Sequence, residues 1–182
     1  MKNNGGIKIK DSQFELLVSG EQLQTVVEQT CGVVRSLGEQ VVFVVMANGA
    51  NWFSQRIFAN FPQTVLDIEY ALLKSYSGTK RNTINAIELP EAEALRGKIV
   101  VILEDFIDSG KTIEYMMDWC LRQAGAKQVF LCPMCIREGV DAERFNVVNS
   151  PLVIEKDKWI VGCGLDYDHW GRNLSDIYYM VK

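Results

Sequence analysis

Apolar residues follow two different spacings along this chain of 182 residues, and stretches of the two kinds alternate. Continuous apolar runs rich in Val and Ile, at 41–46 and 98–103, have the composition of strands buried on both faces. Between such runs, apolar residues recur every three or four positions, as in amphipathic helices. The alternation predicts an α/β fold, a doubly wound and mainly parallel twisted sheet with helices on both faces. Further strands are expected at 65–73, 83–89 and 128–136.

Three helices are predicted, one before these strands and two between them. Ser19 and Gln22 form a capping-box pattern, and the apolar positions behind them run to about Gly38. A second helix is expected at 52–60, after a turn of small residues. A third is expected at 112–124, where the next residue is a glycine, the residue type that most often terminates helices.

Residues 1–182 are expected to form a single domain, because the chain's length and its 48% content of hydrophobic residues suffice for one sizeable core. The core is expected at about 20–138. The remaining segments, 1–19 and 139–182, contain short extended stretches and are expected to form a small hood beside it.

Net charge and cysteine content narrow the function classes. A net charge of −4 argues against nucleic-acid binding, and no apolar run is long enough to span a membrane. Five cysteines without a signal-peptide core predict reduced thiols and a cytoplasmic location. Cys132 and Cys135 are spaced like a redox pair or half a zinc site, but a second pair is missing. We therefore interpret them as buried thiols of a core strand.

Residues with the chemistry of a phosphate site follow the strand at 98–103. Ser109, Gly110, Lys111 and Thr112 lead into the third predicted helix. Backbone N–H groups at a helix N-terminus are unpaired and the helix dipole is positive there, which favours an anion. A glycine allows the backbone to approach that anion closely. A P-loop is rejected, because its pattern needs a second glycine five residues before Gly110, where the chain has Asp105.

Three carboxylates, Glu104, Asp105 and Asp108, stand beside this anion site. A simple phosphate pocket would not favour them, so the ligand is expected also to carry hydroxyls, a metal ion or a basic nitrogen. A sugar phosphate with a free diol fits, with Glu104 and Asp105 near its hydroxyls and Asp108 free to take or give a proton. The plainer alternative is a solvated acidic turn that caps a helix.

The segment VILEDFIDSGKT, residues 101–112, resembles the signature of the type I phosphoribosyltransferases, and among them it is most similar to hypoxanthine-guanine phosphoribosyltransferase. The resemblance covers roughly residues 18–180. It implies binding of phosphoribosyl pyrophosphate (PRPP), with Glu104 and Asp105 facing the ribose hydroxyls. It also implies that residues 108–112 cradle the 5′-phosphate and that Asp108 faces N7 of the purine.

Other positions are assigned only by this resemblance. The family's Lys-Gly pair, which contacts pyrophosphate through its backbone, aligns with Ala47-Asn48, so the Lys is absent here. Ser75-Tyr76 match the pair that opens a flexible lid over the reaction centre. The family's base-reading Lys falls at Ile136, which makes the next residue the expected donor. The expected contacts of the purine are Arg137, Trp159, Ile160 and Asp166, and Arg172 is expected to hold pyrophosphate.

The resemblance implies a purine salvage enzyme that makes IMP or GMP from PRPP and a 6-oxopurine. It implies Mg²⁺ as cofactor, with Asp166, Glu104 and Asp105 as candidate ligands, and a homodimer or homotetramer. Two alternatives stay open. The departures at Ala47-Asn48 and Ile136 would suit a catalytically weak relative that binds PRPP or a nucleotide as a regulator. For Trp159, packing in the core is the alternative to stacking on a base.

Overall fold

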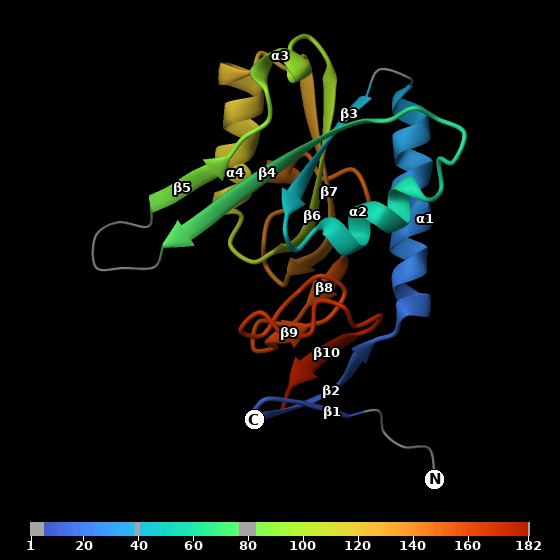
Figure 1. Cartoon of the computed structure of the whole chain (residues 1–182), viewed down its shortest axis with the longest axis vertical. Coiled ribbons are helices and arrows are strands. Elements are labelled where there is room, and N and C mark those ends of the chain that lie inside the picture. Colours follow the sequence, from blue (N-terminus) through green and yellow to red (C-terminus); the bar gives the residue numbers. More distant parts are fainter. Residues whose placement is uncertain (1–5, 39–40, 77–82, 182) are drawn as a thin grey trace.

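A six-stranded sheet forms the centre of the molecule in the computed structural model, which describes residues 6–38, 41–76 and 83–181 (Figure 1). The spatial order is β5-β4-β3-β6-β7-β8, and every neighbouring pair is parallel except β4 and β5. The strands are β3 (Val41–Ala47), β4 (Asp67–Tyr76), β5 (Thr83–Glu88), β6 (Ile99–Ile107), β7 (Gln128–Arg137) and β8 (Leu152–Ile154). The predicted mainly parallel sheet is confirmed.

The central strands β3, β6 and β7 are the continuous apolar runs of the sequence, and most of their side chains are buried. Strand β6 continues past its predicted end at residue 103, because its parallel ladder with β7 holds through the pairs Glu104–Pro133 and Ile107–Ile136. The acidic segment, which was predicted to follow the strand, therefore begins inside it. Hydrogen bonding to a neighbouring strand decided this boundary, and local composition could not reveal it.

Helices cover both faces of the sheet, as predicted (Figure 1). On one side, α1 (Gly20–Leu37) packs on β7, and α2 (Asn51–Phe58) packs on α1, β3 and β6. On the other side lie α3 (Ala92–Leu95) and α4 (Lys111–Asp118), which continues into the π-helical turn η1 (Trp119–Gln123). Both hydrogen bonds of the capping box before α1 are present. Within the residues described, no helix is long and apolar enough to cross a membrane.

A four-stranded antiparallel sheet lies beyond the carboxyl ends of the core strands and forms the hood (Figure 1). Its order is β1-β2-β10-β9, with β1 (Ile7–Ile9), β2 (Ser12–Val18), β9 (Ile160–Val161) and β10 (Ile177–Met180). It thus combines the two chain ends assigned to a hood. One part of 139–182 differs from that assignment, because β8 extends the core sheet by pairing in parallel with β7. A short 3-10 turn, η2 (Glu143–Phe145), precedes β8.

Cys132 and Cys135 lie inside β7 and are fully buried as free thiols. Burial raises the pKa of Cys132 to about 12 and that of Cys135 well above its usual range. Thiols that stay protonated at neutral pH are poor nucleophiles and poor metal ligands. The interpretation of the C-x-x-C pattern as core packing is confirmed.

Candidate active site

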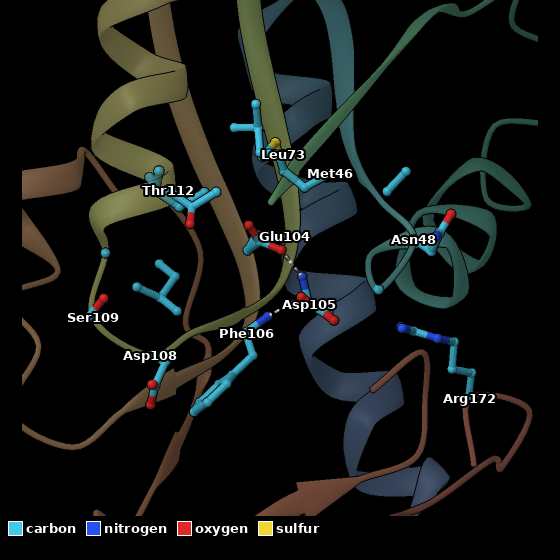
Figure 2. Close-up of a pocket in the computed structure, with 15 residues that line it drawn as sticks. Met46, Asn48, Leu73, Glu104, Asp105, Phe106, Asp108, Ser109, Thr112 and Arg172 are labelled. Atoms are coloured by element: carbon cyan, nitrogen blue, oxygen red, sulfur yellow. Dashed lines mark hydrogen bonds between the residues drawn. The ribbon is translucent and has the colours of Figure 1, made fainter. Parts of the chain in front are cut away.

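A cavity of about 340 Å³ opens where β3 and β6 end, at the edge of the sheet that faces the hood (Figure 2). We call it the first cavity. Most of the residues predicted to bind a phosphorylated sugar form its walls. They are Ala47, Asn48, Glu104, Asp105, Asp108, Ser109, Gly110, Thr112 and Arg172. The carboxyl edge of a parallel sheet is where ligands of open α/β proteins bind.

Glu104 and Asp105 form an acidic pair at the end of β6. Glu104 is only 7% exposed, and its Oε1 accepts a hydrogen bond from the backbone N–H of Asp105 at 3.0 Å. Burial and the neighbouring Asp105 charge raise the pKa of Glu104 well above its usual range. Burial also raises the pKa of Asp105, an effect that hydrogen bonds and the charge of Arg172 partly oppose. A ligand that brings hydroxyl donors or a cation would lower the free-energy cost of burying these carboxylates in their charged form.

One helix N-terminus and one guanidinium supply the positive side of the first cavity. Helix α4 follows Gly110, whose φ of +77° is left-handed, and both Gly110 and Thr112 line the cavity. The helix has no side-chain hydrogen bond at its N-cap among the described residues. Arg172 Nη1 donates to the carbonyl of Gly164 at 2.7 Å, and its guanidinium points into the cavity (Figure 2). Free N–H groups beside a cation suit phosphate.

Lys111 departs from the predicted phosphate set. It is the first residue of α4, it is exposed, and it does not belong to the cavity wall. The geometry of the helix sets the direction in which the side chain of its first residue points. The motif alone does not reveal that direction. Any contribution of Lys111 to the cradle is then through its backbone N–H.

The turn after β3 approaches the acidic pair most closely at Gly49. A Cβ atom added there would overlap the carboxylate of Asp105, and one added at Gly164 would overlap the carbonyl oxygen of Gly49. Ala47 and Asn48, joined by a cis peptide bond, also line the cavity. The closest approach of the backbone therefore falls at Gly49, one residue after the pair that the resemblance assigned to pyrophosphate, because such an approach requires a residue without a side chain.

A second cavity, of about 190 Å³, adjoins the first and shares three wall residues with it, Asp105, Phe106 and Asp108. Its other walls are the four residues predicted to contact a purine, together with Leu165. They are Arg137, Trp159, Ile160 and Asp166. Trp159 is 59% exposed, so its indole is not packed in the core. The tertiary structure thus brings residues from β6, β7 and the hood to one small space.

Asp108 and Arg137 form an ion pair at the boundary of the two cavities. Arg137 Nε donates to Asp108 Oδ1 at 2.8 Å, and Nη1 donates to the carbonyls of Glu155 and Lys158, both at 2.8 Å. The guanidinium also lies over the ring of Phe106, 4.6 Å from its centroid. The Arg137 side chain is 16% exposed, whereas that of Asp108 is 68% exposed. Arg137 is therefore a fixed cation and not an ordinary surface charge.

The three candidate metal ligands are not gathered into one cluster. Within the described part of the chain, no group of three or more His, Cys, Asp or Glu side chains could hold a metal ion. Asp166 lines the second cavity, where its Oδ1 pairs with Arg172 Nη2 at 2.5 Å and its Oδ2 accepts the N–H of His169 at 2.8 Å. Glu104 faces the first cavity. Asp105 lines both cavities, and the sequence could not reveal that Glu104 and Asp166 line different ones.

The predicted lid lies mostly outside the residues that the structure describes. Ser75 and Tyr76 are the last residues of β4 and pair with Ile84 and Thr83 of β5. The following segment, 77–82, is not described. The beginning of the expected lid is therefore part of an antiparallel strand pair.

Several residues at the site were missed by the sequence interpretation, among them Gly49, Phe106 and Phe145. Gly49 had a signal, the Asn-Gly dipeptide, that the alignment passed over. Phe106 lines both cavities but is an ordinary apolar residue in the motif. Phe145 of η2 is buried beneath Gly110, where a Cβ atom would come within 2.6 Å of its Cε2. No local pattern connects Phe145 with Gly110, because only the packing of the segment before β8 brings them together.

Residues 25–168 match the sequence profile of the phosphoribosyl transferase domain, and the chain belongs to this family. The mainly parallel sheet with its small antiparallel hood is the type I fold of the family.

Individual relatives share much of the chain. The hypoxanthine-guanine phosphoribosyltransferase of Aquifex aeolicus is 26% identical over 176 residues, which are 94% of this chain and 97% of the relative. A hypoxanthine phosphoribosyltransferase structure from Staphylococcus aureus superposes with a TM-score of 0.75 at 22% identity, over 92% of this chain and 91% of that one. The hypoxanthine-guanine phosphoribosyl transferase of L. donovani superposes with a TM-score of 0.76 at 19% identity, over 92% and 96%. The structural likenesses show that the fold is shared.

Proposed function

We propose that this protein transfers the 5-phosphoribosyl group from PRPP to N9 of hypoxanthine or guanine, which yields IMP or GMP and pyrophosphate. The observation that carries the proposal is the pair of adjoining cavities that share Asp105, Phe106 and Asp108. One cavity has the charge pattern of a site for a phosphorylated sugar. The other has an aromatic and apolar wall that suits a flat base. The names of the relatives support a 6-oxopurine as that base.

In the first cavity, the N-terminus of α4 with Ser109 and Thr112 would bind the 5′-phosphate of PRPP. Glu104 and Asp105 would accept hydrogen bonds from the ribose hydroxyls, in addition to those that Glu104 Oε1 and Asp105 Oδ1 already accept from backbone N–H groups. Arg172 would bind pyrophosphate, which a guanidinium suits by charge and bidentate geometry. As pyrophosphate leaves, positive charge develops on the ribose, and the nearby carboxylates would stabilise it.

In the second cavity, Trp159 would stack on the purine and the backbone of Ile160 would contact its edge. Asp108 would hold or take the N7 proton while N9 forms the new bond. Arg137 Nη2 makes no hydrogen bond within the described residues, so its two N–H groups would be available to the C6 oxygen of the base. The 6-amino group of adenine is itself a hydrogen-bond donor, so it could not pair with these N–H groups.

Mg²⁺ belongs to this proposal as the ion that accompanies PRPP. The carboxylates of Glu104, Asp105 and Asp166 are hard oxygen donors on the walls of the two adjoining cavities. Mg²⁺ usually keeps several waters and binds through one or two carboxylates plus substrate phosphates, so separated carboxylates fit it without a protein-built cluster. When bound, the ion would neutralise part of the pyrophosphate charge.

The proposal is tested with a panel of bases in the presence of PRPP and Mg²⁺, read by nucleotide and pyrophosphate formation. We expect turnover of hypoxanthine or guanine and the weakest turnover of adenine, because buried donors left unpaired disfavour the amino base by about 1–3 kcal/mol. Adenine as the best substrate would contradict the 6-oxopurine assignment alone. Binding of PRPP without turnover of any base would instead support a regulatory relative.

Removal of divalent ions is expected to abolish turnover. PRPP carries many negative charges, and without a divalent ion Arg172 is the main cation of the first cavity available to offset them. The measurement is the rate with excess EDTA, followed by titration with MgCl₂ until the rate recovers. Full turnover in EDTA would contradict the metal requirement.

A further inference from the structure

Arg137 makes contacts with two separate segments of the chain, at the end of β6 and just before β9 of the hood. Its Nε bonds Asp108, beyond the end of β6, and its Nη1 bonds the carbonyls of Glu155 and Lys158, in the connection between β8 and β9. The ring of Phe106 lies against one face of the guanidinium. Of the five N–H groups that a guanidinium carries, three therefore have partners inside the protein.

These contacts fix the guanidinium before any ligand binds. Two carbonyl oxygens that accept from a single nitrogen determine the plane of the group, and the aromatic ring supports that plane from one side. Most exposed ion pairs contribute little, since two long side chains must be ordered to form them. Here only Asp108 remains to be ordered, because its partner is already held. The pair is thus more than a chance surface contact.

The hood end of the same guanidinium lies next to the stacking wall of the second cavity. Glu155 and Lys158 bound a turn, closed by the hydrogen bond from Lys158 N to the Glu155 carbonyl at 3.2 Å. Trp159 follows this turn directly and lines the cavity. Arg137 therefore connects the segment that presents Trp159 to the carboxylate of Asp108.

We propose that Arg137 is a positioning residue, which orients the Asp108 carboxylate toward the base and holds it at a set distance from the turn before Trp159. The inference rests on the proposed function, in which Asp108 handles the N7 proton. It differs from recognition of the base, because it acts through Nε and Nη1 and leaves Nη2 for the ligand. Without the pair, a side chain as exposed as Asp108 would sample several rotamers.

The test is a double-mutant cycle between Arg137→Lys and Asp108→Asn. Lysine keeps the positive charge but has no planar fork to bond Asp108 and both carbonyls together. In the wild-type background we expect Arg137→Lys to lower kcat on hypoxanthine by about 10–100-fold, as expected for a misplaced catalytic group. In the Asp108→Asn background the same change should lower kcat by less than about threefold, because no carboxylate remains to be oriented.

Two controls separate positioning from other effects. Arg96→Lys alters an Arg–carboxylate pair with Glu93 that lies on α3 and away from both cavities, and its kcat should equal that of the wild type. The ratio of kcat/KM for hypoxanthine to that for adenine reports whether Arg137 reads C6, independently of the cycle. Arg137→Gln is the second variant if Arg137→Lys lowers the Tm enough to reduce the folded fraction.

Equal losses in both backgrounds would overturn the proposal, since Arg137 would then act independently of Asp108. So would an Arg137→Lys variant with wild-type kcat. The same double-mutant cycle is then measured with the Kd for IMP, determined by calorimetry. This measurement does not require turnover. A wild type that binds IMP without turning over any base would contradict the proposed enzyme activity, while coupling in Kd would still support the link between Arg137 and Asp108.

Discussion

Replacement of Asp108 by Asn is expected to lower kcat by about 10²–10⁴-fold, the usual effect of losing one positioned acid–base group. An amide cannot take the N7 proton. It has nearly the size of the carboxylate, and the backbone donors of the α4 N-terminus remain, so the KM for PRPP should change far less than kcat. The measurement is the initial rate with hypoxanthine at saturating PRPP, together with the KM for PRPP.

A matched control is available on α4. Asp118 also forms an exposed ion pair, with Arg122 Nε at 2.6 Å, but it does not line either cavity. Asp118→Asn therefore makes the same chemical change outside the site, and its kcat should match the wild type because exposed pairs contribute about 0–1 kcal/mol. An Asp108→Asn enzyme within about threefold of wild type would rule out the assigned role, since general-base effects are larger than that.

Replacement of Gly49 by Ala is expected to lower kcat/KM for PRPP by about 100-fold, because a displacement of catalytic groups by about 1 Å can have that effect. The added methyl group would occupy the place of the Asp105 carboxylate, so the end of β6 or the turn after β3 must move. Overpacking of this kind typically destabilises a protein by about 1–3 kcal/mol. Rates should therefore be compared well below the Tm of the variant.

Gly32 provides the matched control for this substitution. It lies within α1, it is exposed, and a Cβ atom added there would meet nothing within 4 Å. Gly32→Ala should leave activity unchanged and raise stability by about 0.5–1 kcal/mol, as Ala replaces Gly inside a helix. Wild-type kcat/KM in Gly49→Ala would show that the close approach of the turn to Asp105 has no part in PRPP binding.

The strands and helices that frame the site were predictable because their signals are local. A buried central strand needs apolar side chains on both faces, which makes β3, β6 and β7 visible as runs of Val, Ile and Leu. The capping box at Ser19 and Gln22 likewise satisfies the N–H groups of its own helix. Each of these features depends on residues close together in the sequence.

Boundaries and side-chain directions were less predictable, because they depend on partners far along the chain. Glu104 lies in a strand and not a loop, since β7 continues to pair with β6 beside it. The side chain of Lys111 is exposed and does not line the first cavity, although Lys111 belongs to the motif. The turn after β3 comes closest to Asp105 at Gly49, one residue after the Ala47-Asn48 pair named from the sequence, because only the tertiary structure shows where a side chain cannot fit.

The sequence by itself determined the α/β class, the order of the elements and the acidic strand-to-helix segment with its chemistry, because each is encoded by neighbouring residues. The tertiary structure decided that two cavities adjoin, that the carboxylates Glu104 and Asp166 face different ones, and that Arg137 is fixed between β6 and the hood. These facts depend on where separate segments meet. That placement is set by burial of the whole core and by hydrogen bonds between segments distant in sequence.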